Sequence, residues 1–172
     1  IERTGEPTFL ERFIHSAIYA ARADVGSVVH SHSHGAVIFS VSNQPLRAMC
    51  HTSGFIGSGV PVFEMRNCAH GSNDLLIRNQ PLGEALAAQL GSENLVLMRG
   101  HGSTAVGKTL EQAVYRAVYT EVNAKLQATA FSLGAVTFLS EPEIVAIRAD
   151  EDVYLERTWQ LWRAQFASQD QR

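Results

Sequence analysis

The chain alternates between apolar residues at helical spacing and short apolar runs typical of strands. Between positions 10 and 24 apolar residues recur every three or four places, which predicts a helix with one apolar face. Thr8 is expected to cap this helix, with Glu11 completing a capping box. Val28 and Val29 are β-branched and precede polar residues, which predicts the end of a buried strand. The chain is therefore expected to open with a helix and a strand that runs back along it.

The same patterns continue through the rest of the chain. They predict helices at 35–42, 80–90, 109–133 and from 141 onward, and strands at 46–50, 60–63, 94–99, 103–106 and 136–139. Thr109 and Ser140 are expected to cap helices, because Gln112 and Glu143 follow three residues later. Pro61 cannot donate a hydrogen bond to a neighbouring strand, so its strand is predicted to lie near an edge.

Composition narrows the function classes. The 172 residues are 45% hydrophobic and 18% charged, which fits one domain with a sizeable core. The net charge is −3 without blocks of like charge, so neither a nucleic-acid surface nor a polybasic membrane patch is expected. No apolar run approaches the ~20 residues of a membrane span. The two cysteines make only a weak case for a secreted disulfide framework, so a cytoplasmic location is expected.

The first candidate functional residues stand where the predicted strand ends. His30 and His32 are two residues apart, so their side chains share one face of the strand. Paired imidazoles suit a core poorly because their nitrogens need partners, but they bind zinc and other divalent metals well. The alternative is a polar strand end with solvated histidines.

Two further stretches favour the metal interpretation. The helix and the returning strand have similar lengths, which would bring Glu11 and His15 close to His30 and His32. His101 follows a buried strand and lies between two glycines, which permit close backbone approach. Three histidines from two strand ends would form an open metal site, with Glu11 nearby as a general acid or base.

Three motifs, in this order and spacing, resemble the class II aldolase/adducin family. They are Glu11-Arg-Phe-Ile-His15, His30-Ser-His32 and Arg99-Gly-His101-Gly102. The resemblance implies one α/β domain over 1–172, with three α/β/α layers around a mostly antiparallel sheet. It also implies a homotetramer with sites at subunit interfaces. The family's N-terminal segment before the glutamate motif is expected to be missing here.

The resemblance assigns roles to these residues. It implies one divalent cation per chain held by His30, His32 and His101, with Zn²⁺ expected first and Mn²⁺, Fe²⁺ or Co²⁺ as alternatives. Glu11 would be the catalytic acid/base. Arg99 is a candidate ligand for a substrate carboxylate, although a salt bridge at the strand end is an equal alternative.

Two departures from the family pattern bear on the substrate. Phe9-Leu10 stands where sugar-phosphate aldolases have a phosphate-binding Ser-Ser pair. Thr52, a further candidate for substrate binding, stands after His51 where those aldolases have a proton-donating tyrosine. The motifs look more similar to the branch that decarboxylates hydroxylated aromatic or pyridine dicarboxylates.

The expected function is therefore that of a metal-dependent lyase in aromatic compound catabolism, which decarboxylates a small carboxylate substrate. Two alternatives remain: an aldolase acting on a hydroxy-keto or sugar-phosphate substrate, and a non-enzymatic adducin-like interaction module. The apolar pair Phe55-Ile56 and the spaced aromatics Trp159, Trp162 and Phe166 add to the expectation of a homo-oligomer.

Overall fold

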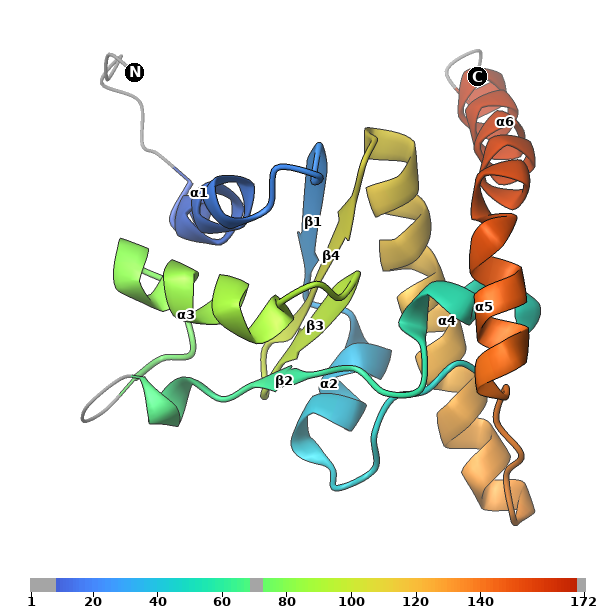
Figure 1. The fold of residues 1–172 in the computed structure, drawn as a ribbon, viewed down its shortest axis with the longest axis horizontal. Helices are drawn as coiled ribbons and strands as arrows, with labels where there is room; N and C mark the ends of the chain where they lie inside the picture. Colours follow the sequence, from blue (N-terminus) through green and yellow to red (C-terminus); the bar gives the residue numbers. More distant parts are fainter. Residues whose placement is uncertain (1–8, 69–72, 170–172) are drawn as a thin grey trace.

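A four-stranded sheet stands at the centre of the computed structural model, which describes residues 9–68 and 73–169 (Figure 1). The elements in chain order are α1 (Arg12–Ala21), β1 (Ser27–Ser31), α2 (His34–Val41), the 3-10 helix η1 (His51–Ile56), β2 (Val62–Phe63), the 3-10 helix η2 (Met65–Asn67), α3 (Gln80–Leu90), β3 (Leu95–Met98), β4 (Gly102–Gly107), α4 (Leu110–Leu133), α5 (Glu141–Ala149) and α6 (Glu151–Gln169). The strand order is β1-β4-β3-β2.

The sheet is mostly antiparallel, as expected. β4 pairs antiparallel with both β1 and β3, whereas β2 runs parallel to β3 at the edge. The edge position of β2 agrees with the prediction from Pro61, although only Val62 and Phe63 form the strand.

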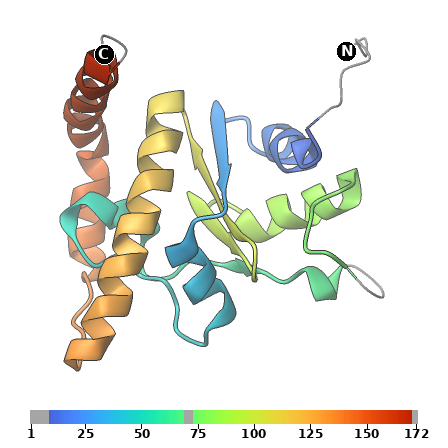
Figure 2. The same ribbon diagram turned by 180° about the vertical axis from the view of Figure 1, so that it is seen from behind.

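Helices cover both faces of this sheet, which gives the three expected layers. Along β3, Val96 and Met98 pack into a core with α1 and α3, whereas Leu95 and Leu97 pack into a second core with α2 and α4. Strand side chains alternate between faces, so every β3 residue is buried on one side or the other. Figures 1 and 2 show α1 and α3 on one side of the sheet and α4 on the other, with α5 and α6 outside α4.

Two predicted strands are not formed. Residues 46–50 and 136–139 lie outside the sheet. In the first segment the backbone N–H groups of Arg47 and Met49 donate to the buried side chains of Gln127 and Asn123 on α4, at 2.9 and 2.8 Å. These side chains satisfy the backbone groups that a neighbouring strand would otherwise have to satisfy.

The last predicted helix is two helices, α5 and α6, which meet at Asp150. The capping box at its start is confirmed, since Glu143 accepts hydrogen bonds of 2.7 Å from the backbone and hydroxyl of Ser140. Thr109 caps α4 as predicted, but Gln112 accepts from the backbone of Lys108 instead of completing a box.

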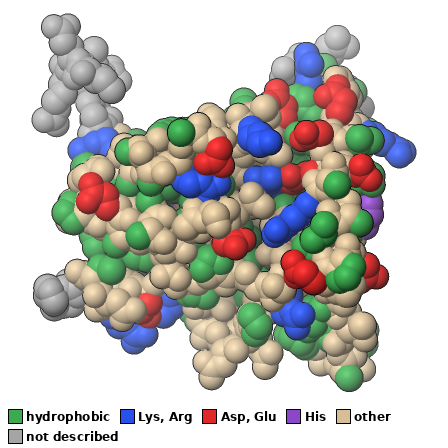
Figure 3. All heavy atoms as spheres, viewed as in Figure 1, with side chains coloured by type: hydrophobic (Ala, Val, Ile, Leu, Met, Phe, Trp, Pro, Cys, Tyr) green, Lys and Arg blue, Asp and Glu red, His purple; other side chains and the backbone are tan. Residues whose placement is uncertain are grey.

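One face of the molecule mixes charges of both signs. On the face in Figure 3, acidic and basic side chains are interspersed, and they form no continuous field of one sign over the described residues. Within the same residues, no helix combines the length and the apolar character needed to cross a membrane.

Candidate metal centre

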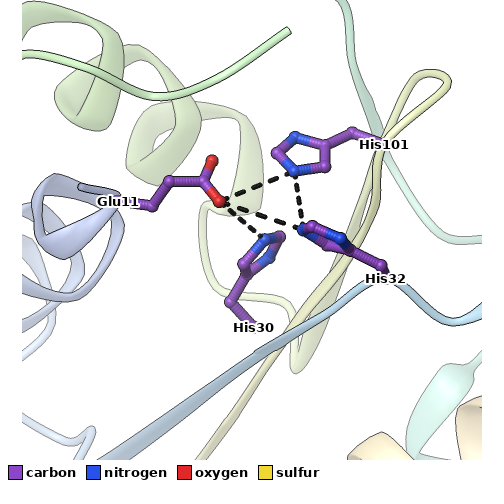
Figure 4. A group of neighbouring side chains, drawn as sticks. All are labelled: Glu11, His30, His32 and His101. Carbon is purple, nitrogen blue, oxygen red and sulfur yellow. Dashed lines mark hydrogen bonds and ion pairs between the residues drawn. The ribbon is translucent and has the colours of Figure 1, made fainter. Parts of the chain in front are cut away.

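Glu11, His30, His32 and His101 converge where β1 ends (Figure 4). One potential ligand atom from each lies within 4.8 Å of all the others. Oε2 of Glu11 is 3.3, 3.9 and 3.6 Å from Nε2 of His30, His32 and His101, respectively. The structure therefore brings together four of the five residues that the sequence predicted to meet. His15, which was expected beside His30 and His32, is not a member of this group.

Close backbone contact brings two of the histidines together. His101 lies in the turn between β3 and β4, and Gly102 starts β4 beside the end of β1. A Cβ atom on Gly102 would collide with the carbonyl oxygen of Ser31 and come within 3.0 Å of the His32 Cα. Only glycine permits this approach, which leaves Nε2 of His32 and Nε2 of His101 2.9 Å apart.

Glu11 does not cap α1 with its side chain. It occupies the N-cap position, but its carboxylate makes no capping hydrogen bond, so the predicted capping box is wrong; Thr8 lies outside the described residues. Oε1 instead accepts a 3.2 Å hydrogen bond from the Ile77 N–H. Oε2 thereby faces the histidines in a side chain that is only 7% exposed.

His30 is prepared to act as a ligand. Its Nδ1 lies 3.1 Å from the carbonyl oxygen of Ser103, which can only accept, so Nδ1 carries the hydrogen and Nε2 keeps a free lone pair. Burial, assisted by the neighbouring His101 and His32 and opposed by Glu11, lowers the pKa of His30 to about 4. The imidazole is therefore neutral at neutral pH, as metal binding requires.

The buried Nε2 of His30 fits the role of a metal ligand best. It makes no hydrogen bond within the described residues, and it points toward Glu11 and the other two imidazoles. Burial lowers the pKa of His101 as well. Three imidazole nitrogens beside one carboxylate form a donor set that suits Zn²⁺ and other divalent first-row metals.

The His32 side leaves an opening. Its side chain is 64% exposed, whereas those of His30 and His101 are 5% and 7% exposed. A small molecule can therefore approach the cluster from this side without displacing a core residue.

The other two predicted site residues contact groups outside the cluster. The Arg99 guanidinium forms an ion pair with Glu64, which is the alternative that the sequence left open. Thr52 lies in η1, where its carbonyl oxygen accepts a 3.0 Å hydrogen bond from Tyr115 and its hydroxyl contacts Cys50. Their assignment to substrate binding stays a prediction.

Sequence reasoning missed the backbone groups that orient the site. The Ile77 N–H and the Ser103 carbonyl direct Glu11 and His30, but any residue type supplies these groups. No sequence signal distinguishes them.

Relatives named as decarboxylases resemble this chain. It is 38% identical over 175 residues to decarboxylase tropJ of Talaromyces stipitatus, covering 90% of this chain and 66% of that protein. It is 28% identical over 126 residues to a 3,4-dihydroxyphthalate decarboxylase of Arthrobacter keyseri, covering 70% of this chain and 48% of that one. The chain thus spans between about half and two thirds of the length of these curated relatives.

The fold also recurs in solved structures. An aldolase II superfamily protein from Pseudomonas syringae superposes with a TM-score of 0.71 at 23% identity, over 96% of this chain and 66% of that one. Residues 1–128 match the Class II Aldolase and Adducin N-terminal domain. With the three-layer fold and the predicted motif residues assembled at one point, the chain belongs to the class II aldolase and adducin family.

Proposed function

We propose that this protein is a metal-dependent carbon–carbon lyase that decarboxylates a hydroxylated aromatic or pyridine dicarboxylate. The observation that carries the proposal is the convergence of Glu11 with the Nε2 atoms of three histidines. Relatives named decarboxylase tropJ and 3,4-dihydroxyphthalate decarboxylase support this choice of reaction. An adducin-like module without enzymatic activity would have no need for such a cluster.

His30, His32 and His101 are the proposed ligands of one divalent cation, with Zn²⁺ the first candidate and Mn²⁺, Fe²⁺ or Co²⁺ the alternatives. When bound, the cation would act as a Lewis acid and stabilise negative charge that develops on a substrate oxygen. The open side at His32 gives the hydroxyl and carboxylate of the substrate access to this position.

Glu11 is the proposed proton donor. Its Oε2 carries the proton and delivers it to the ring carbon that bears the departing carboxylate. The bond from that carbon to the carboxylate breaks, carbon dioxide leaves, and a C–H bond replaces it. Glu11 then takes up a proton from water. The hydrogen bond from Ile77 to Oε1 keeps Oε2 directed at the reaction site.

Arg99 and Thr52 remain proposed substrate contacts. Arg99 would have to exchange its ion pair with Glu64 for a substrate carboxylate. Thr52 contacts Tyr115 and Cys50 in its own chain, and its proposed role is to contact substrate bound at a neighbouring subunit's site. A homotetramer in the cytoplasm is part of this proposal.

Product analysis tests the reaction directly. The purified protein, loaded with Zn²⁺, is incubated with a panel of dihydroxyphthalates and hydroxylated pyridine dicarboxylates, and released carbon dioxide is measured. A matched sample treated with chelator is the control. We expect metal-dependent release of carbon dioxide. Release of pyruvate or glycolaldehyde from hydroxy-keto substrates, without carbon dioxide release from the panel, would instead indicate an aldolase.

A further inference from the structure

The short helix α2 contacts both segments that carry the exposed and the turn histidine of the metal centre, His32 and His101. It begins two residues after His32, with Ser33 as its N-cap. Near its other end, Ser40 Oγ accepts a 3.0 Å hydrogen bond from the N–H of Gly100, which immediately precedes His101. The position of α2 therefore influences where these two histidines stand relative to each other.

A carboxylate on α4 holds the start of α2. Oε2 of Glu121 accepts hydrogen bonds from the Ser33 hydroxyl and from the Gly35 N–H, the latter at 2.7 Å. Oε1 of Glu121 pairs with Lys125 at 2.9 Å. A Cβ on Gly35 would lie 2.7 Å from Oε2, so the backbone of α2 rests directly on this carboxylate. Glu121 thus satisfies N–H and hydroxyl donors at a helix N-terminus.

His32 depends on such support more than the other histidines do. His30 and His101 are enclosed, and His30 is also oriented by the Ser103 carbonyl. The exposed imidazole of His32 lacks this enclosure. Its placement must come largely from its backbone, which lies between Gly102 on one side and the Ser33 cap on the other.

We propose that Glu121 is a positioning residue of the metal centre, which holds His32 in place through Ser33 and Gly35. Glu121 contacts no member of the cluster itself and acts only through the backbone that follows His32. The inference rests on the proposed metal-dependent function. Partners that orient metal ligands typically contribute 10–100-fold to metal affinity.

The test measures Zn²⁺ affinity by competition with a chromophoric chelator, using the full chain. Three variants are compared with the unaltered protein: Glu121→Ala, Glu121→Gln and Glu143→Ala. Glu143 is the matched control, because it also accepts from a serine hydroxyl and a backbone N–H at a helix start, in α5. Thermal unfolding by circular dichroism is recorded for each variant.

We expect Glu121→Ala to weaken Zn²⁺ binding on the order of 10-fold. Glu121→Gln should retain more affinity, since its amide oxygen still accepts hydrogen bonds, and Glu143→Ala should bind as the unaltered protein does. Ser33→Ala, which keeps Glu121, is a second variant should Glu121→Ala fail to fold, and it too should bind more weakly.

Wild-type affinity in Glu121→Ala, or in Ser33→Ala where that variant is used, would overturn the proposal. So would equal losses in Glu121→Ala and Glu121→Gln, or an equal loss in Glu143→Ala. No Zn²⁺ binding by the unaltered protein would overturn the proposed function together with this inference, so the two failures are distinguishable.

Discussion

His30 shows how single residues combine structural and chemical roles at this site. Its Nδ1–H donates to the Ser103 carbonyl, which fixes both the ring orientation and the tautomer. Its burial keeps the ring neutral, because a charged imidazole would lose its hydration. The same burial should destabilise the metal-free protein at low pH, where His30 would otherwise take up a proton.

In metal-free protein, the free energy of unfolding should fall as the pH is lowered from about 6.5 toward 4. His30 takes up a proton near pH 6.5 in the unfolded chain but only near pH 4 in the folded one. Between these values the unfolded state binds more protons, so stability falls with decreasing pH, by on the order of 1 kcal/mol per pH unit. Urea unfolding in chelator at pH 7.5, 6 and 5 measures this slope.

His30→Gln provides the comparison, because glutamine does not titrate in this range. The variant should show a shallower dependence on pH than the unaltered protein. An identical slope in His30→Gln and the unaltered protein would contradict the assignment of this pH dependence to His30.

The members of the cluster could be predicted from sequence because each carries distinctive chemistry. Histidines two apart at a strand end, a histidine between glycines and a glutamate at a helix start were sufficient to name Glu11, His30, His32 and His101. The carboxylate's true partner, the Ile77 N–H, could not be predicted, since it comes from a backbone 66 residues away in sequence.

Helix α4 supplies hydrogen-bond partners to residues 46–50, which the sequence pattern predicted to be a strand. The fully buried Asn123 accepts from the Met49 N–H and the Ser53 hydroxyl, and donates to the Arg47 carbonyl at 2.8 Å. Residues 46–50 were predicted as a strand because their apolar pattern is local. The polar side chains that replace a strand partner come from a distant helix and leave no trace in that pattern.

Asn123→Ala should lower the free energy of unfolding by about 2–3 kcal/mol, because buried backbone groups would lose their partners. Chemical denaturation measures the change. Gln160→Ala is the control, because this exposed α6 residue donates a hydrogen bond to Glu156 one helical turn away. The loss of this bond should cost less than about 0.5 kcal/mol. Equal stability of the two variants would show that the Asn123 contacts do not hold the segment.

An apolar groove of about 570 Å³ lies between α4 and α6. Its lining is mostly apolar and includes Val114, Val118, Trp159, Trp162 and Phe166. Trp162 packs against the core beside α4. Phe166, in contrast, is 70% exposed, which fits the expected contact with another copy of the chain. The expectation that Phe55 and Ile56 add to such a surface is wrong, because both are buried in the core.

Sedimentation equilibrium should show a homotetramer at micromolar concentration. Phe166→Glu should shift the protein toward smaller species, because it places a charge in the apolar groove. Val153→Glu is the matched control, since Val153 is equally apolar, 68% exposed and on the same helix but outside the groove lining. A monomer in the unaltered protein, or the same shift in both variants, would contradict this surface as the interface.

Three histidines are proposed to hold the metal while Glu11 donates the proton. Metal content and carbon dioxide release, measured on the same samples, separate these two roles. Glu11→Gln should retain about one metal ion per chain while turnover falls by ~10²–10⁴-fold, because the amide cannot donate an acidic proton to carbon. His101→Ala should lose metal affinity, and activity with it. Near wild-type turnover in Glu11→Gln would contradict the acid/base role. Loss of metal from Glu11→Gln would instead make Glu11 a ligand, and full metal content in His101→Ala would contradict the proposed ligand set.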